Sequence, residues 1–207
     1  MPNFVWNSSF ISFDRMKSIL DNIISNTKIP DDMIDKARSS IQVKHVAKGE
    51  ILLRENEKAT RSFYVQKGLL RSYVIDKKGK EHIFSFAPED WIVSDMASQM
   101  QHTPSRLFID ALEDSEIEIF DRTIFEKLGI VSVNGSAFGV QRLLKRISTL
   151  QDRIIMLISA TALERYQDFE KTYPNIIQRV PQKMIASYLG ITPEALSKIR
   201  GEYARKK

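Results

Sequence analysis

Between residues 40 and 120 the sequence is a series of short strand-type segments, which leaves few folds open. Apolar and polar residues alternate at 41–44 and 116–119, and short runs of strand-forming residues occur at 51–53 and 62–65. Alternation with a period of two is typical of strands that bury one face, whereas a helix repeats about every 3.6 residues. Many short strands at this spacing predict a small barrel, roll or sandwich.

A β-hairpin is predicted inside this region. Segments 69–75 and 81–86 have the composition of strands, and the stretch Asp76-Lys-Lys-Gly79-Lys lies between them. Glycine tolerates the positive φ angle that tight hairpin turns require. We therefore expect Gly79 to lie in the turn.

A short amphipathic helix is predicted near the N-terminus, over residues 12–25. Ser12 can cap its first turn because a serine hydroxyl accepts hydrogen bonds from free backbone N–H groups. The apolar residues recur at helical intervals, which indicates one buried face. These residues are Phe13, Met16, Ile19, Leu20 and Ile23.

A longer helix is predicted from residue 140 onward. Its apolar residues alternate at intervals of three and four, the spacing of a helix that packs along a partner helix. Leu144, Ile155 and Ile158 widen the apolar face, so packing on the same molecule is the alternative interpretation. The expected dimer seam consists of Val140, Leu143, Ile147, Leu150, Ile154 and Leu157.

Positive charge is concentrated at the C-terminal end of the sequence. The chain of 207 residues has 31 Lys and Arg against 26 Asp and Glu, a net charge of +5. Residues 178–207 contain seven basic and two acidic residues, so they carry the whole excess. A neutral body with a basic end indicates contact with a polyanion, most simply nucleic acid. A solvated, lysine-rich tail is the alternative.

Several classes of protein are excluded or disfavoured by composition. The absence of cysteine excludes disulfides, cysteine-ligated metal sites and a cysteine nucleophile. His45, His82 and His102 lack the paired spacing of a cupin-type metal site. No nucleophile elbow, phosphate loop or dinucleotide fingerprint occurs. We therefore expect a protein that is not an enzyme and holds neither a metal nor a resident cofactor.

The sequence also predicts the compartment. Its first ten residues lack the basic start and continuous apolar stretch of a signal peptide. The longest apolar run, 154–158, is far shorter than the roughly 18 residues that a membrane-spanning helix needs. We expect a cytoplasmic protein without a membrane segment.

The C-terminal segment predicts two short helices joined by a glycine turn. Residues 182–189 have one apolar face, and Gly190 suits the left-handed position that ends a helix. Thr192 can cap the second helix, Pro193 suits its first position, and Glu194 lies beside its positive end. The inner face of the second helix carries Leu196 and Ile199, and the outer face carries Ser197, Lys198, Arg200 and Arg205.

The stretch PQKMIASYLGITPEALSKIR, residues 181–200, resembles a helix-turn-helix. Ala186, Gly190 and the apolar residues Ile185, Leu189, Ile191, Leu196 and Ile199 stand at the expected offsets. Because a β-rich region and a long helix precede it, the chain resembles the Crp/Fnr family of bacterial transcription regulators. The resemblance implies an α+β fold with a cyclic-nucleotide-binding-like β-roll over 1–133, a dimerisation helix over 134–160 and an all-α helix-turn-helix domain over 161–207.

The resemblance also implies a function. It predicts a homodimer that regulates transcription by binding a palindromic operator in double-stranded DNA through the helix from Pro193 to Arg205, with RNA polymerase as a further partner. Glu194 and Lys198 would read base edges in the major groove, and Pro193 would set the start of the helix. Phosphate contacts would come from Lys183, Ser187, Thr192, Arg200 and Arg205. The alternative is a regulatory module whose C-terminal helices bind a protein partner.

Two departures from the family pattern affect these expectations. The sequence stops soon after the second helix, so we expect the family's winged hairpin to be missing and assume none of its phosphate contacts. In members that bind cyclic AMP, a glutamate holds the ribose and an arginine holds the phosphate. Ser105 occupies the arginine position here, and Arg106 falls one residue later, on the opposite face of a strand.

The effector pocket is therefore expected to differ from that of the cyclic-AMP-binding members. Asp95 is the candidate for the glutamate position, and Trp91 is expected to lie in the core. The candidate pocket residues are Trp91, Asp95, Ser105 and Arg106. We expect a protein that does not respond to cyclic AMP and that binds a different effector or none.

Overall fold

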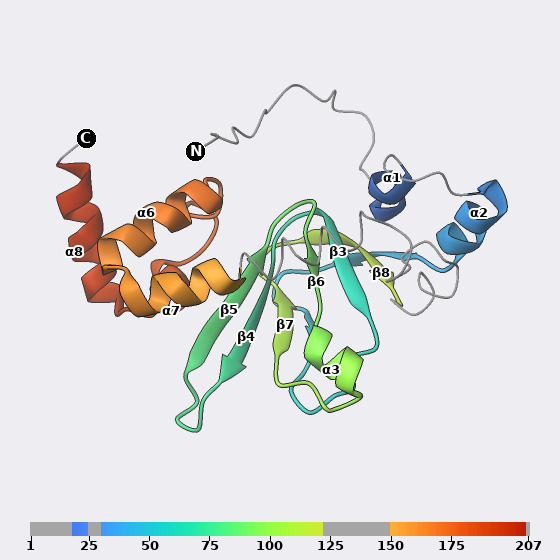
Figure 1. The fold of residues 1–207 in the computed structure, drawn as a ribbon, viewed down its shortest axis with the longest axis horizontal. Helices are drawn as coiled ribbons and strands as arrows, with labels where there is room; N and C mark the ends of the chain where they lie inside the picture. The colour runs from blue at the N-terminus through green and yellow to red at the C-terminus, as the bar shows by residue number, and fades with distance from the viewer. Residues whose placement is uncertain (1–17, 25–29, 122–149, 206–207) are drawn as a thin grey trace.

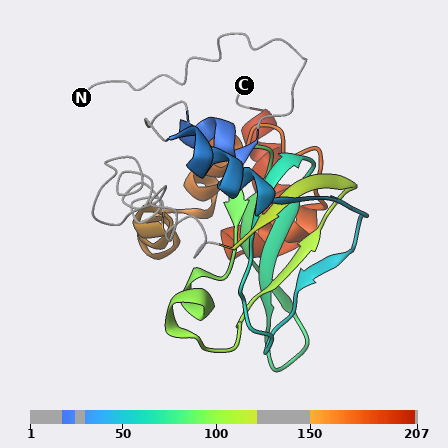
Figure 2. The ribbon, with the colours of Figure 1, turned by 90° about the vertical axis from the view of Figure 1, so that its right-hand side faces the viewer.

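The computed structural model describes residues 18–24, 30–121 and 150–205. Within these ranges, two antiparallel sheets form a β-roll, and helices lie on two sides of it (Figure 1). Helices α1 (Ile19–Ile24) and α2 (Asp31–Ser39) lie on the side opposite the C-terminal helices in Figure 1, and in the turned view of Figure 2 they lie toward the viewer. The predicted α+β fold with a β-roll and an all-helical C-terminal region is confirmed.

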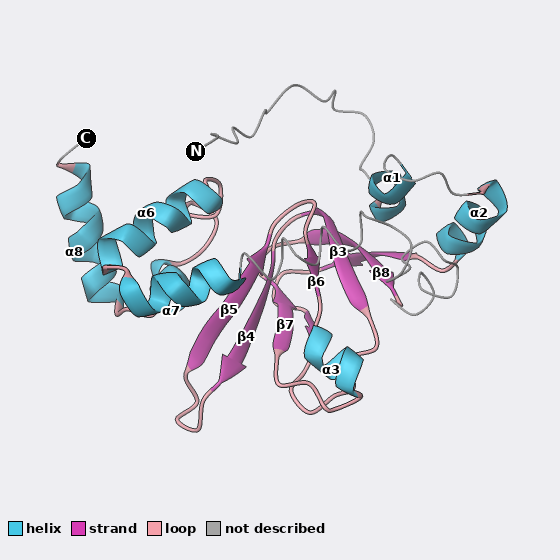
Figure 3. Ribbon diagram, in the orientation of Figure 1, coloured by secondary structure: helices cyan, strands magenta, loops and turns pink. Residues whose placement is uncertain are grey.

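The roll consists of two four-stranded sheets within the described residues (Figure 3). One sheet has the order β1-β8-β3-β6 and the other the order β2-β7-β4-β5. The short strands predicted between residues 40 and 120 are therefore confirmed. Their bounds are β1 (Gln42–Val46), β2 (Ile51–Leu53), β3 (Ser62–Lys67), β4 (Leu70–Ile75), β5 (Glu81–Ala87), β6 (Ile92–Val93), β7 (Phe108–Ala111) and β8 (Ser115–Phe120).

An apolar core lies between the two sheets. Val65 on β3 pairs with Ile117 on β8, and both side chains are fully buried. Leu70 on β4 pairs with Ala111 on β7 and faces the same core from the other sheet. Burial of these apolar side chains stabilises the roll by roughly 1.5–3 kcal/mol for each large residue. The roll is thus a stable platform for the elements that pack on it.

The predicted hairpin is formed by β4 and β5. The N–H of Asp76 donates to the carbonyl of Lys80 at 3.0 Å, and Gly79 has a φ of +78°. The Asp76 carboxylate accepts hydrogen bonds from the N–H groups of Lys78 and Lys80 and contacts His82 Nε2 at 2.8 Å. The His82 contact and these N–H groups lower the pKa of Asp76 to about 2. The turn is therefore held by its own aspartate.

The helices agree with the predicted periodicities where they can be compared. α1 lies within the predicted helix 12–25, and its Ile19 and Leu20 are buried. Residues 150–159 are helical, as predicted for the long helix. The seam positions Val140, Leu143 and Ile147, together with Leu144, lie outside the described residues.

The remaining helices are α3 (Met96–Gln101), α6 (Ala162–Thr172), α7 (Gln182–Leu189) and α8 (Pro193–Ala204). α3 lies between β6 and β7 along the chain, whereas α6, α7 and α8 form the C-terminal region. None of the helices that the structure describes has the length and apolar character needed to cross a membrane.

Candidate nucleic-acid interface

The turn between α7 and α8 has the geometry that the sequence predicts. Gly190 adopts the left-handed conformation, with φ +68° and ψ +33°, and Ile191 N–H donates to the Ala186 carbonyl at 3.0 Å. Thr192 caps α8 by accepting a hydrogen bond from Ala195 N–H at 3.2 Å, and Pro193 is the first helical residue. A left-handed glycine followed by a threonine cap forces a tight change of direction between the two helices.

A small core joins α6, α7 and α8. Ala186 of α7 and Leu196 of α8 are fully buried in it. Tyr166 of α6 is also buried and meets the Tyr203 ring edge-on, with 6.2 Å between the ring centroids. These contacts turn one face of α8 inward. The opposite face of the helix therefore points away from the core.

The outward face of α8 carries the residues predicted to contact bases. Glu194, Ser197 and Lys198 are exposed. Ser197 and Lys198 follow Glu194 by three and four residues, so all three lie on one side of the helix. A hydrogen bond from its own N–H, followed by one from the Thr192 hydroxyl, lowers the pKa of Glu194. Its carboxylate is therefore ionised at neutral pH and available as an acceptor. Among the other predicted contacts, Lys183, Thr192, Pro193 and Arg205 are exposed and Arg200 is half-buried.

Ser187 has a different role from the predicted phosphate contact. Its hydroxyl accepts a hydrogen bond from Ile83 N–H at 3.0 Å and donates to the Glu81 carbonyl at 3.2 Å. Both partners belong to β5 of the roll. In this arrangement the Ser187 hydroxyl has no proton left to donate to a phosphate, and it joins the helix-turn-helix to the roll instead.

The roll and the C-terminal helices share one apolar core. Phe86 of β5 is fully buried, and its ring lies 6.1 Å from Phe169 of α6 and 5.6 Å from Tyr188 of α7. Tyr173, which follows α6, meets Phe86 edge-on at 6.3 Å, and burial raises the pKa of its phenol. Aromatic pairs with this geometry add roughly 0.5–1.5 kcal/mol each beyond the area they bury. The two parts of the chain are therefore packed as one body.

Trp91 was expected in the core, and this expectation is wrong. Its side chain is 38% exposed, and its ring lies 5.6 Å from that of Tyr173. Trp91 follows β5 in a short turn at the edge of the roll. It therefore lies at the junction with the C-terminal helices, where its ring contacts Tyr173.

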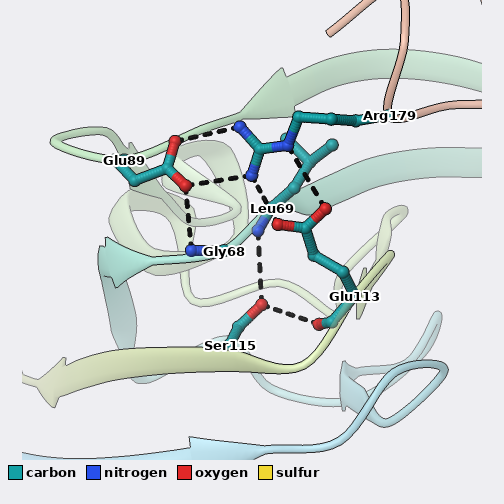
Figure 4. Close-up of polar contacts among 6 residues, drawn as sticks. All are labelled: Gly68, Leu69, Glu89, Glu113, Ser115 and Arg179. Carbon is teal, nitrogen blue, oxygen red and sulfur yellow. Dashed lines mark hydrogen bonds and ion pairs between the residues drawn. The ribbon is translucent and has the colours of Figure 1, made fainter. Parts of the chain in front are cut away.

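Arg179, between α6 and α7, connects this region to two loops of the roll (Figure 4). Its guanidinium donates to both carboxylate oxygens of Glu89, at 2.9 and 3.0 Å. It also donates to both oxygens of Glu113, at 2.5 and 3.2 Å. Glu89 precedes β6 and Glu113 follows β7, so Arg179 joins the two ends of the segment that contains β6, α3 and β7.

The loops that hold these carboxylates are closely packed. Gly68 N–H donates to Glu89 at 3.0 Å, and Leu69 N–H donates to the Ser115 hydroxyl at 3.3 Å. Gly68 has a φ of +102°, and a Cβ at this position would lie 2.2 Å from Ser115 Oγ. Only glycine fits there without displacing the loop. The packing places Glu89 and Glu113 side by side beneath Arg179.

A second arginine, Arg71 on β4, lies beneath α7. It is only 6% exposed, and its guanidinium binds both carboxylate oxygens of Asp110 at 2.8 and 2.9 Å. It also donates to Glu81 at 2.6 Å, and its Nη1 lies 3.9 Å from the Met184 sulfur of α7. A buried arginine with carboxylates on two neighbouring strands ties them together, because removal of either partner leaves an uncompensated charge.

A third arginine, Arg153, lies on the helix 150–159. It donates to the carbonyl of Phe84 and, at 3.2 Å, to that of Ile83, both on β5. Its guanidinium stacks over the Tyr188 ring at 4.1 Å. The sequence patterns assign no role to Arg71, Arg153 or Arg179. An arginine inside the apolar strand Leu69-Leu-Arg-Ser-Tyr73 was the one signal that a buried partner must exist.

The candidate effector residues Asp95 and Ser105 lie together. Both side chains are buried, and the Ser105 hydroxyl donates to Asp95 at 2.8 Å. Asp95 also accepts hydrogen bonds from the backbone N–H groups of Ser98 and Arg106, and so caps α3. The Arg106 side chain is exposed. The buried Ser94 hydroxyl has no hydrogen-bond partner within the described part of the chain.

No group of three or more histidine, aspartate or glutamate side chains suited to a metal ion was found within residues 18–24, 30–121 and 150–205.

The helix 150–159 leaves part of its apolar face uncovered. Leu150, Ile154 and Leu157 are 40%, 56% and 40% exposed, and Ile155 and Ile158 are exposed beside them. Leu150, Ile154 and Leu157 are the predicted seam positions that lie within the described residues.

Comparison with known protein families and sequences identifies relatives. Residues 43–129 match the family of cyclic nucleotide-binding domains. The chain is 26% identical over 174 residues to the anaerobic regulatory protein of Haemophilus influenzae, a match that covers 78% of this chain and 66% of the relative. It is 25% identical over 178 residues to the regulatory protein HlyX of Actinobacillus pleuropneumoniae, covering 78% and 71%. The matched part thus spans slightly less than two thirds of the Haemophilus relative.

Solved structures share the fold. FixK2 from Bradyrhizobium japonicum superimposes with a TM-score of 0.68 at 20% identity, covering 80% of this chain and 85% of that chain. CooA from Carboxydothermus hydrogenoformans gives 0.64 at 18% identity, covering 93% and 87%. A regulator of the crp/fnr family from Eubacterium rectale gives 0.60 at 17% identity, covering 86% and 85%. The β-roll followed by C-terminal helices is therefore a known arrangement.

Replacement of Arg179 by alanine tests the junction between the roll and the helices. Because Glu89 and Glu113 are partly exposed, we expect the free energy of unfolding to fall by only about 1 kcal/mol. Amide hydrogen exchange, measured by NMR, should accelerate at Gly68 and Ile83. Lys171→Ala, at an exposed position on α6, is the control.

Acid should weaken the same junction. Burial acts to raise the pKa of Glu89, but the hydrogen bonds from Arg179 and from backbone N–H groups outweigh it, so the pKa is lowered. A carboxylate with a lowered folded pKa contributes stability above its ordinary value of 4.5 and loses it as the pH falls through the folded pKa. If amide hydrogen exchange at Gly68 and Ile83 is unchanged in Arg179→Ala at neutral pH, Arg179 does not stabilise the junction between the roll and the helices.

Proposed function

We propose that this chain, which belongs to the Crp/Fnr family of transcription regulators, binds duplex DNA sequence-specifically through α8 and thereby controls transcription. The observation that carries the proposal is the exposed row Glu194, Ser197 and Lys198 on a capped helix whose other face is buried. The names of the relatives, an anaerobic regulatory protein and the regulatory protein HlyX, support a regulatory role. RNA polymerase is a further proposed partner, and the cytoplasm is the proposed compartment.

The residues of the interface divide into two roles. Lys198 donates to guanine O6 or N7 and Glu194 accepts from cytosine N4, so these two discriminate between base pairs. Lys183, Thr192, Arg200 and Arg205 bind phosphates, which position the protein without selecting a sequence. The neutral charge of residues 1–177 supports this division, because the excess positive charge lies at the C-terminal end.

The proposed active form is a symmetric homodimer on a palindromic operator. Leu150, Ile154 and Leu157 leave an apolar stripe in contact with water in the single chain, and a symmetry-related copy of the helix would cover it. The proposed division places a sensor domain at 1–133, the dimerisation helix at 134–160 and the DNA-binding domain at 161–207.

We propose further that cyclic AMP is not the effector. A buried cyclic phosphate needs a positioned cation, since an unpaired charge in the roll costs several kcal/mol. Ser105 stands where that cation would be, and its hydroxyl is bonded to Asp95, whose carboxylate would repel a phosphate. The Arg106 side chain is exposed to solvent. These features favour a different effector, or regulation without one.

Lys198→Ala and Arg205→Ala separate base reading from phosphate binding. Lys198→Ala should cost roughly 1–3 kcal/mol of binding free energy on the preferred duplex and relax specificity at one base pair. Arg205→Ala should weaken all duplexes alike and flatten the salt dependence by about one unit. Fluorescence anisotropy on selected and random duplexes measures both. An equal loss on both duplexes for Lys198→Ala contradicts the assignment.

Ile154→Asp tests the dimer. Ile154 is more than half exposed in the single chain, so the change should leave the fold intact and place two unpaired charges in the seam of the dimer. Sedimentation should show a dimer for the wild type and a monomer for the variant. Ser159→Asp is the matched control, because Ser159 is exposed on the opposite side of the same helix. A monomeric wild type at micromolar concentration overturns the homodimer.

Calorimetry with cyclic AMP and cyclic GMP tests the effector proposal. We expect no binding heat for either nucleotide up to millimolar concentration. A dissociation constant of about 1 mM corresponds to a binding free energy of about −4 kcal/mol, so any binding should be weaker than this. A micromolar or tighter dissociation constant that Arg106→Ala abolishes and Lys58→Ala preserves would show that Arg106 turns inward to hold the phosphate.

A further inference from the structure

We propose that the tip of the β4–β5 hairpin is a second DNA-contacting element, in which Lys77, Lys78 and Lys80 bind phosphates beside the segment contacted by α8. This inference rests on the proposed function, because it concerns how the same protein holds duplex DNA. It adds a surface of the roll, outside the C-terminal helices, to the interface.

The hairpin tip presents a concentrated positive charge. Lys77, Lys78 and Lys80 are exposed and lie within four consecutive residues. The two nearest carboxylates are committed to other partners: Asp76 binds His82 and the backbone of the turn, and Glu81 binds the Arg71 guanidinium at 2.6 Å. The turn backbone is fixed by its hydrogen bonds. The ammonium groups therefore extend from a stable support.

The hairpin lies against the first helix of the helix-turn-helix. The Ser187 hydroxyl of α7 bonds to the Glu81 carbonyl and to Ile83 N–H, and the Met184 sulfur lies 3.9 Å from Arg71 of β4. Figure 1 shows α7 beside β5, with the hairpin turn projecting beyond the contact. Lys80 directly precedes Glu81, so the basic tip begins one residue from the contact with α7.

This placement has a consequence for DNA binding. In helix-turn-helix complexes the first helix crosses the sugar-phosphate backbone while the second enters the major groove. Lys183 is exposed on α7, next to Met184, and is positioned for such a phosphate. A backbone that passes α7 is then flanked by the hairpin tip. The lysines supply the phosphate contact that Ser187, bonded to β5, does not.

The contribution of the hairpin lysines to DNA affinity should depend on where they lie and not on the net charge of the protein alone. At physiological salt the Debye length is about 8 Å, so a lysine contributes appreciably only when a phosphate comes close to it. Each phosphate neutralised adds about 0.9 to the slope of log affinity against log salt concentration. Three hairpin contacts would therefore contribute a slope of about 2 to 3, which is readily measured.

The test compares two variants of equal net charge. The first carries Lys77→Gln, Lys78→Gln and Lys80→Gln. The second carries Lys48→Gln, Lys58→Gln and Arg61→Gln, which neutralise exposed cations elsewhere on the roll. The probe is a duplex that the wild-type protein selects from a random pool, used at about 40 base pairs and trimmed to about 20, the length of two half-sites one helical turn apart.

On the long duplex, the hairpin variant should lose about tenfold in affinity at physiological salt and about 2 to 3 in salt slope. Its base preference should be unchanged, because phosphate contacts do not select sequence. The control variant should keep the wild-type slope, and the difference between the two variants should shrink on the short duplex. Circular dichroism should show the same thermal unfolding for all three proteins, since every substituted side chain is exposed.

Equal slopes for the two variants, or a wild-type slope for the hairpin variant, overturn the inference and leave the hairpin available to a protein partner. These outcomes are distinct from failure of the proposed function. If the wild type selects no duplex and Lys198→Ala changes nothing, DNA binding itself is wrong and the inference falls with it. If Lys198→Ala relaxes specificity while the hairpin variant behaves as wild type, only the hairpin inference is overturned.

Discussion

The contact between Phe86 and the aromatic rings of the C-terminal helices is the interaction on which the rest of the structure depends. Phe86 is fully buried and meets Phe169, Tyr173 and Tyr188, which come from α6, the segment after it, and α7. Such burial is strong but non-directional, so by itself it fixes proximity and not orientation. Because the rings belong to both parts of the chain, the roll and the helix-turn-helix share one core.

Orientation comes from the polar contacts around that core. Arg179 binds Glu89 and Glu113 through both carboxylate oxygens of each, and fork-to-fork pairing of this kind is geometrically specific. The Ser187 hydroxyl sets the register of α7 on β5. Together these contacts fix how the C-terminal helices are oriented on the roll. Arg179 connects the segment between α6 and α7 to the loops at both ends of the segment that carries Asp95.

The candidate site therefore has one part that depends on the helix-turn-helix alone and another part that depends on the roll as well. The outward face of α8 depends only on the helix-turn-helix, since its cap, its glycine turn and Leu196 lie within that unit. The environment of α7 depends on the roll, which covers Ser187 and places the lysines of the β4–β5 turn nearby. The proposed DNA-binding surface therefore extends across two parts of the fold. The exposed residues Leu150, Ile154 and Leu157 on the helix 150–159 form the proposed contact with a second chain, and Leu157 also lies near Gly190 in the turn between α7 and α8.

The sequence alone determined the features that short stretches of chain control: the strands between 40 and 120, the turn at Gly79, and the helix-turn-helix with Gly190 and Thr192. These follow from backbone dihedral preferences and hydrogen bonds between residues a few positions apart, which are visible as local patterns. Only the tertiary structure decided the roles of Ser187 and Arg179. Ser187 bonds to Ile83, which is 104 residues away in the sequence, and Arg179 bonds to Glu89, which is 90 residues away. It also corrected the expected burial of Trp91. A local sequence pattern does not indicate which distant surfaces contact each other, because those contacts depend on the packing of the whole chain.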